Sequence, residues 1–122
     1  MSISEAESLV MDVLWQRHPQ SAEEVLAALA PATQWQEPTV KTLLNRLLKK
    51  RAIAAQRDGR RYLYRPFLTR ESYVHAQSKT LLDRLFGGRV APLVAHFSQH
   101  EKLSKKDLDE LKRLIAELDR GR

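Results

Sequence analysis

The sequence predicts a mainly α protein with a small β-hairpin. Apolar residues recur at helical spacings of three and four along several stretches of the 122 residues. A serine followed three residues later by an acidic residue, a pattern typical of helix N-termini, precedes three of these stretches, at Ser4, Ser21 and Ser104. One segment, from Ile53 to Arg65, instead combines short strand-like runs with a turn dipeptide.

Two helices are predicted at the N-terminal end. The capping pattern at Ser4 begins the first helix, which has an apolar stripe and which we expect to end near Arg17. The residue before Pro19 favours extended geometry and interrupts the helix. Ser21 begins a second helix, and we expect Pro31 to close it.

The third predicted helix has two different faces. Pro38 fits its first turn, where a backbone N–H has no intrahelical partner. Five apolar residues then form one stripe: Val40, Leu43, Leu44, Leu47 and Leu48. The opposite face presents Thr39, Thr42, Asn45, Arg46 and Lys49. We therefore expect one face to join the core and the other to suit DNA.

A two-stranded hairpin is predicted directly after this helix. Its strands are residues 53–57 and 61–65, joined through Asp58-Gly59, a dipeptide suited to a tight turn. Pro66 lacks a backbone donor and should end the second strand. Three helices followed by a β-ribbon make a winged helix-turn-helix domain over residues 1–66, with the third helix as recognition helix and the hairpin as wing.

Positive charge is concentrated on this helix and hairpin. The segment from Lys41 to Arg65 contains nine basic residues and one acidic residue, a net charge of +8, whereas the whole chain has +6. Such a patch predicts a polyanionic partner, here double-stranded DNA. We predict that Thr39, Thr42 and Arg46 contact base edges or nearby phosphates. The remaining predicted DNA-binding residues, most of them for phosphates, are Lys41, Asn45, Lys49, Lys50, Arg60 and Arg61.

Residues 67–122 are predicted to form a helical dimerisation domain. We expect helices from Thr69 to the Gly87-Gly88 pair, around residues 90–98, and from Ser104 onward. Three short apolar helices cannot bury all their apolar side chains among themselves, so a second copy of the segment is the simplest cover. The predicted dimerisation residues are Val74, Leu81, Leu85, Leu93, Phe97, Leu108, Leu111, Ile115 and Leu118.

Several other classes of function are not favoured by the composition. The chain has no cysteine, which excludes disulfides and thiolate metal sites. His96 and His100 share a helical spacing, but two imidazoles without a third ligand fall short of a usual metal site, so we expect neither metal nor cofactor. No catalytic motif is recognisable, and we expect a non-enzyme. No membrane-spanning run or signal peptide is apparent, and we expect a cytoplasmic protein without direct membrane binding.

A series of short motifs follows in order along nearly the whole chain: Ser4-Glu5-Ala6-Glu7, Val10-Met11, Leu14-Trp15, Trp35, Thr39-Val40, Thr42, Asn45-Arg46-Leu47, Lys49-Lys50, Asp58-Gly59-Arg60, Tyr62-Leu63-Tyr64 and Leu103-Ser104. In this order and spacing the chain resembles the BlaI/MecI family of bacterial transcriptional repressors, the penicillinase repressor family. This resemblance implies a winged-helix domain, a dimerisation domain and a palindromic operator.

The resemblance also implies how repression ends. In that family a membrane-bound sensor with a zinc peptidase domain takes part in induction, and the repressor is cleaved at an Asn-Phe bond. This chain has His96-Phe97 at the matching place, which makes these two residues the candidate cleavage site. A copper-responsive branch has a cysteine-rich motif, which this chain lacks.

Two alternatives remain open from the sequence. A basic patch also suits an RNA-binding or ribosome-associated winged-helix protein, although RNA readers usually expose more aromatic residues. A protein-interaction adaptor with an acidic partner is the other alternative.

Overall fold

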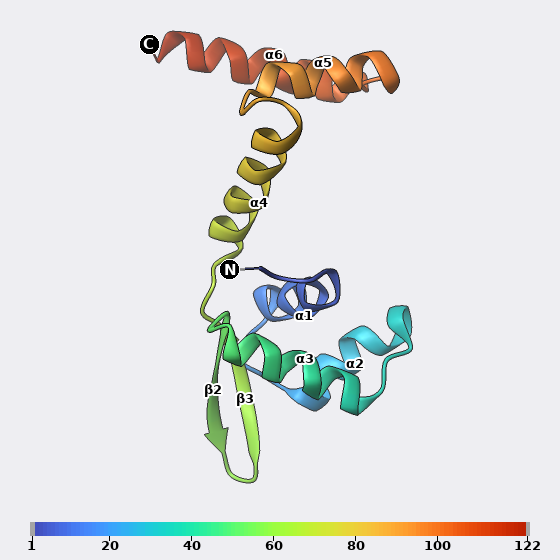
Figure 1. Cartoon of the computed structure of the whole chain (residues 1–122), viewed down its shortest axis with the longest axis vertical. Coiled ribbons are helices and arrows are strands. Elements are labelled where there is room, and N and C mark those ends of the chain that lie inside the picture. Colours follow the sequence, from blue (N-terminus) through green and yellow to red (C-terminus); the bar gives the residue numbers. More distant parts are fainter. Residues whose placement is uncertain (1, 122) are drawn as a thin grey trace. The chain divides into compact units, whose positions relative to one another are not determined.

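The computed structural model describes residues 2–121 and shows there a mainly α fold with a small antiparallel sheet, as predicted (Figure 1). Its elements are α1 (Glu5–Gln16), β1 (Gln20–Ser21), α2 (Ala22–Thr33), α3 (Glu37–Lys49), β2 (Ile53–Asp58), β3 (Arg61–Pro66), α4 (Arg70–Leu85), α5 (Val90–His100) and α6 (Lys105–Arg120).

The chain forms two compact units, residues 1–75 and 76–122, which divide within α4. The predicted boundary between a DNA-binding and a dimerisation domain, at residues 66 and 67, stays a prediction. The start of α4 makes contacts within the first of the two compact units. The indole of Trp15 in α1 donates a hydrogen bond of 2.8 Å to the Leu68 carbonyl, and its ring centroid lies 5.5 Å from that of Tyr73. The beginning of α4 therefore packs with the N-terminal unit.

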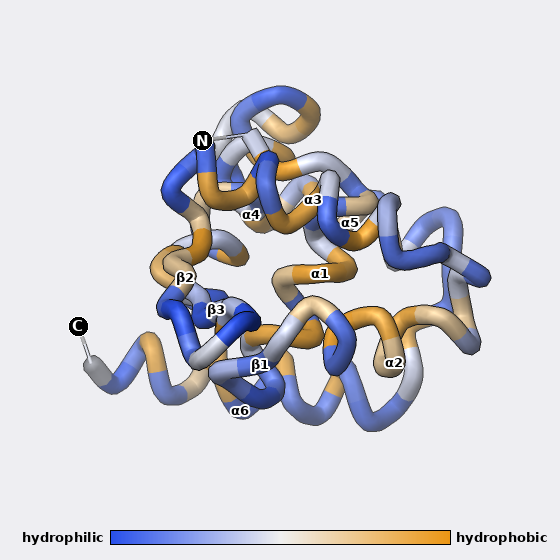
Figure 2. Tube along the Cα trace, turned by 90° about the horizontal axis from the view of Figure 1, so that it is seen from below, coloured by the Kyte–Doolittle hydropathy of each residue, from blue (hydrophilic) through white to orange (hydrophobic). Residues whose placement is uncertain are grey.

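The core of the N-terminal unit lies among α1, α2, α3 and the sheet. Hydrophobic residues recur along α1 and α2, in orange in Figure 2. The buried core residues are Val10, Met11, Leu14, Val25, Leu29, Val40, Leu43, Leu44, Leu47, Ala52, Ile53 and Tyr64. Four of the five residues of the apolar stripe predicted for the third helix are therefore buried, and Leu48 is half-buried. The polar residues of that helix remain at the surface.

The two predicted capping boxes both form. Ser4 Oγ accepts from the Glu7 N–H at 3.1 Å while the Glu7 carboxylate accepts from the Ser4 N–H at 2.8 Å, and Ser21 makes the same pair of bonds with Glu24. The expectation that Pro31 closes α2 is wrong, because α2 includes Pro31 and continues to Thr33. A proline in the last turn costs a single i−4 hydrogen bond, which the packed helix tolerates.

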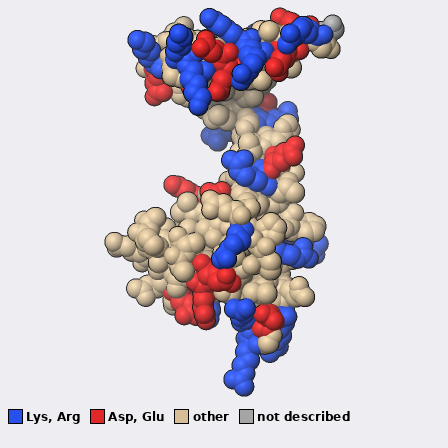
Figure 3. All heavy atoms as spheres, turned by 180° about the vertical axis from the view of Figure 1, so that it is seen from behind, with Lys and Arg blue, Asp and Glu red and all other residues tan. Residues whose placement is uncertain are grey.

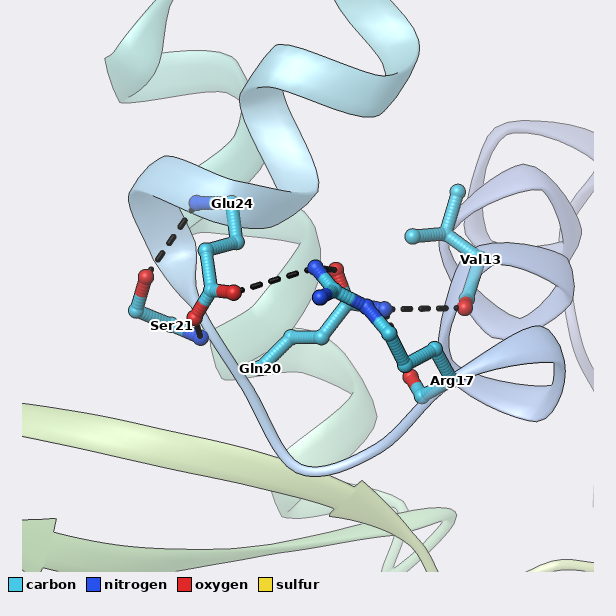
Figure 4. A network of polar contacts seen from close by, with 5 residues as sticks. All are labelled: Val13, Arg17, Gln20, Ser21 and Glu24. Atoms are coloured by element: carbon cyan, nitrogen blue, oxygen red, sulfur yellow. Dashed lines mark hydrogen bonds and ion pairs between the residues drawn. The ribbon is translucent and has the colours of Figure 1, made fainter.

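The sheet has a third strand that the sequence did not predict. β1 pairs with the outer edge of β3, so the strand order is β1-β3-β2, with Gln20 opposite Tyr64 and Ser21 opposite Leu63. The side-chain amide of Gln20 donates to the Val13 carbonyl at 3.0 Å and also to the carbonyl of Arg17 (Figure 4). Gln20 thereby fixes the turn between α1 and α2 against the sheet.

The hairpin of β2 and β3 turns one residue later than predicted. Asp58 pairs with Arg61, so the two loop residues are Gly59 and Arg60. Gly59 has a φ of 64°. Glycine at the first loop position is typical of one of the two favoured hairpin turns.

The C-terminal unit has the predicted helices, and none of its described residues is buried. Ser104 Oγ accepts from the Asp107 N–H at 3.0 Å and caps α6, and Gly87 and Gly88, with φ of 60° and 76°, follow the end of α4. No residue of α4, α5 or α6 is buried. Among the described residues no helix is both long and apolar enough to cross a membrane.

Candidate nucleic-acid interface

The exposed face of α3 presents the predicted polar residues together. Thr39, Lys41, Thr42, Arg46 and Lys49 are all exposed, as is Asn45 between them. Val40, Leu43, Leu44 and Leu47, which alternate with these polar residues, are buried. The helix is therefore held by its apolar side while its polar side is free for a ligand.

Part of this face is a shallow hollow, which we name the base-reading surface. It has a volume of about 310 Å³ and is lined by Pro38, Thr39, Thr42, Leu43 and Arg46. The Thr42 hydroxyl donates to the Pro38 carbonyl at 2.9 Å. Since a hydroxyl has a single donor, Thr42 offers a ligand its acceptor oxygen and its methyl group. The three residues predicted to meet bases thus lie on one surface.

A second hollow lies between α3, the start of α2 and the hairpin, and we name it the wing groove. It has a volume of about 330 Å³ and brings together Lys41 of α3 with Arg60 and Arg61 of the hairpin. Ser21, Ala22, Glu23, Glu37, Tyr62 and Tyr64 complete its lining. Six of the nine predicted DNA-binding residues thus line these two hollows, three in each. Asn45, Lys49 and Lys50 line neither.

Two ion pairs fix cations of this region. Lys41 Nζ lies 2.8 Å from Glu37 Oε1, four residues earlier on α3, and this hydrogen bond raises the pKa of Lys41. Arg61 lies 3.3 Å from Asp58 Oδ2 across the hairpin turn. Figure 3 shows Lys and Arg side chains gathered at the tip of the hairpin.

Lys50, predicted to contact phosphate, forms an ion pair within the protein. Its Nζ donates to Glu7 Oε1 at 2.6 Å and to the Ser2 carbonyl at 2.8 Å. The Glu7 side chain is 1% exposed and that of Lys50 35%. Burial opposes ionisation of Glu7, but the hydrogen bonds from Lys50 and Ser4 outweigh it and hold the pKa of Glu7 below its ordinary value. Lys50 thus links the end of α3 to the start of α1, and its predicted phosphate contact stays a prediction.

Two further residues, Glu37 and Arg57, were not among the predicted DNA-binding residues. Glu37 lines the wing groove, and its spacing of four residues from Lys41 could have indicated the ion pair. Arg57 is exposed on β2 and donates from Nε to the Gly59 carbonyl at 3.1 Å. Nothing in the local pattern distinguishes Arg57 from any other arginine.

The two histidines considered as metal ligands lie together on α5. The ring centroids of His96 and His100 are 4.5 Å apart. Within residues 2–121 no group of three or more His, Cys, Asp or Glu side chains is placed to hold a metal ion. The His96-Phe97 bond lies inside α5, in hydrogen-bonded helix.

The predicted dimerisation residues are mostly exposed in the single chain. Leu93 and Leu111 are half-buried. The exposed members are Val74, Leu81, Leu85, Phe97, Leu108, Ile115 and Leu118. Side chains of this size rarely stay in water in such number on neighbouring helices.

Comparison with known proteins places the chain in a family. The model of the penicillinase repressor family matches residues 3–117. The penicillinase repressor of Bacillus licheniformis is 31% identical over 115 residues, covering 94% of this chain and 90% of the relative. The penicillinase repressor of Staphylococcus aureus is 28% identical over 98% of this chain and 95% of the relative.

Two solved structures of the repressor BlaI match more than half of this chain. The DNA-binding domain of the repressor BlaI is 35% identical, with a TM-score of 0.55, over 59% of this chain and 88% of that one. The Bacillus licheniformis BlaI monomeric form in complex with the blaP half-operator is 34% identical, with a TM-score of 0.53, over 60% of this chain and 89% of that one. The chain therefore belongs to the penicillinase repressor family of DNA-binding transcriptional repressors.

Proposed function

We propose that the protein acts as a homodimer that binds a palindromic operator, with α3 in the major groove and the hairpin of β2 and β3 on the adjacent backbone. The base-reading surface carries this proposal, because it gathers Thr39, Thr42 and Arg46 on the one exposed face of a helix whose other face is core. Arginine can bond guanine O6 and N7 together, and the threonine methyl suits the thymine methyl.

We propose two half-sites for two reasons. A relative has been solved in complex with a half-operator, and the helices of the C-terminal unit expose apolar side chains. A single recognition helix contacts only a few base pairs, so useful operator affinity needs two copies. Exposed Leu108, Ile115 and Leu118 on α6 supply an apolar surface for a second copy. We infer that they form the dimer contact together with the other predicted dimerisation residues.

Loss of this dimer is the proposed route of release. Cleavage at His96-Phe97, by a membrane-bound sensor peptidase or another protease, would separate α6 from the DNA-binding unit. Because the bond lies inside α5, cleavage requires local unfolding of that helix first.

The test of the base-reading role is the substitution Arg46→Ala. We expect operator affinity to fall by about 1 to 3 kcal/mol, while affinity for random duplex changes far less, because a base contact distinguishes sequences and a phosphate contact does not. Fluorescence anisotropy on both duplexes, with single-stranded RNA as a third ligand, gives the measurement. An equal loss of affinity for operator and random duplex would show that Arg46 contacts the DNA backbone. Tighter binding of the RNA would favour an RNA-binding function.

A further inference from the structure

The wing groove contains a carboxylate beside its basic side chains. Glu37 stands in the first turn of α3 and lines the groove with Lys41, Arg60 and Arg61. Its Oε1 lies 2.8 Å from Lys41 Nζ, and both side chains are more than half exposed. A cation that belongs to a phosphate-binding surface is thus already paired within the protein.

Glu37 belongs to the groove and not to the base-reading surface. The residues of α3 that line the base-reading surface are Pro38, Thr39, Thr42, Leu43 and Arg46, whereas Glu37 and Lys41 line the wing groove. A phosphate that entered the groove would compete with Glu37 for Lys41 and would meet a like charge at close range. Glu23, also in the lining, adds a second negative charge.

We propose that Glu37 limits the affinity of the protein for the DNA backbone by holding Lys41 in an internal ion pair. This inference rests on the proposed DNA-binding function and deepens it. In the free protein Lys41 is neutralised by Glu37, so it adds little to the attraction of phosphates. Since phosphate contacts are independent of sequence, the limit applies equally to operator and to random duplex. Glu37 is an affinity-limiting residue and leaves specificity unchanged.

The direct test is Glu37→Gln in the full chain. Binding is measured on a short duplex that accepts one subunit, in an operator half-site version and a random version. We expect the variant to bind both about 3- to 10-fold more tightly at low salt, and the slope of log affinity against log salt to steepen by about 0.9, the value for one additional phosphate neutralised.

Two further variants separate this mechanism from a simple change of net charge. Glu5→Gln removes the same charge from the first turn of α1, outside the wing groove, and should change affinity less than twofold. The double variant Glu37→Gln with Lys41→Gln should return affinity to about the wild-type value, because the gain depends on the released lysine. Thermal unfolding followed by circular dichroism confirms that each variant is folded.

Other results would overturn either this inference or the proposed function. If Glu5→Gln tightens binding as much as Glu37→Gln, or if the double variant stays tight, the ion pair does not limit affinity. Weaker binding of the operator half-site by Glu37→Gln would make Glu37 a base-reading residue and overturn the proposal. If wild-type protein binds neither duplex, the proposed function itself fails. If wild type binds and Glu37→Gln is unchanged, only the present inference fails.

Discussion

The ion pair of Glu7 and Lys50 joins residues that are 43 positions apart in the chain. Removal of one partner from a buried pair typically costs 3 to 5 kcal/mol, and partial exposure of Lys50 reduces this. We expect Lys50→Met to lower the free energy of unfolding by about 2 kcal/mol. The neighbouring Lys49→Met, which removes an exposed lysine, should stay within about 0.5 kcal/mol in urea unfolding. Equal effects of the two substitutions would contradict a structural role for Lys50.

The ion pair of Glu7 and Lys50 also predicts that the stability of the fold depends on pH. The pKa of Glu7 in the folded protein lies below its ordinary value of 4.5. A carboxyl group of this kind stabilises the fold above its unfolded pKa, and the contribution declines as pH falls through the folded pKa. Wild-type protein should therefore lose stability more steeply than Lys50→Met below about pH 5. Parallel curves of stability against pH for the two proteins would show that the ion pair is not the cause of the acid sensitivity.

The exposure of single residues could be predicted from the sequence, but few of their hydrogen-bond and ion-pair partners could. The exposure of Thr39, Thr42 and Arg46 followed from the helical period alone, because the buried stripe fixes the opposite face. The prediction that Lys50 contacts a phosphate rested on its charge, and its ion pair with the distant Glu7 could not be predicted. Long-range pairs of this kind depend on the packing of α1 against α3, which no local pattern encodes.

The turn of the hairpin depends on the backbone conformation of one residue. Gly59 has a φ of 64°, which β-branched residues resist, although a Cβ there would meet no atom within 4 Å. We expect Gly59→Val to distort the turn and to displace Arg60 and Arg61, so that DNA affinity falls and the salt dependence becomes shallower.

Asparagine tolerates positive φ better than valine, so Gly59→Asn is the matched control for this substitution. It should retain most of the affinity. The fold should survive both changes, since residues 57–61 around the turn are exposed and contribute nothing to the core. An unchanged salt slope in Gly59→Val would exclude the hairpin from the DNA-binding surface.

Helices were easier to predict than strands, for a physical reason. The serine caps at Ser4, Ser21 and Ser104 act on residues three positions away, so their signal is local and all three formed. β1 has two residues, and it is a strand only because β3 offers an edge to Gln20 and Ser21. A two-residue run has no period of its own, and its pairing depends on a segment more than 40 residues away.

In the proposed dimer, the contact between the two copies determines how tightly the whole protein binds its operator. Ile115 is 57% exposed in the single chain and lies in the apolar stripe of α6. A glutamate there would place an unpaired charge in the proposed dimer contact. We expect Ile115→Glu to be monomeric in sedimentation and to bind the full operator about 10²-fold or more weakly, while its affinity for a half-operator is unchanged.

The control for this variant is Leu9→Glu, which adds the same charge at an exposed apolar residue of α1. It should remain dimeric. A dimeric Ile115→Glu protein would show that α6 does not form the contact. A monomer that still bound the full operator at wild-type strength would show that repression does not depend on avidity.

The most direct measurement of the central claim is selection of bound sequences from a library of random duplex DNA by the wild-type protein. A homodimer with one recognition helix per copy should enrich a palindrome, with two half-sites whose centres lie about 10 base pairs, or a multiple of that, apart. Enrichment of a single asymmetric motif, or of no sequence at all, would contradict the account.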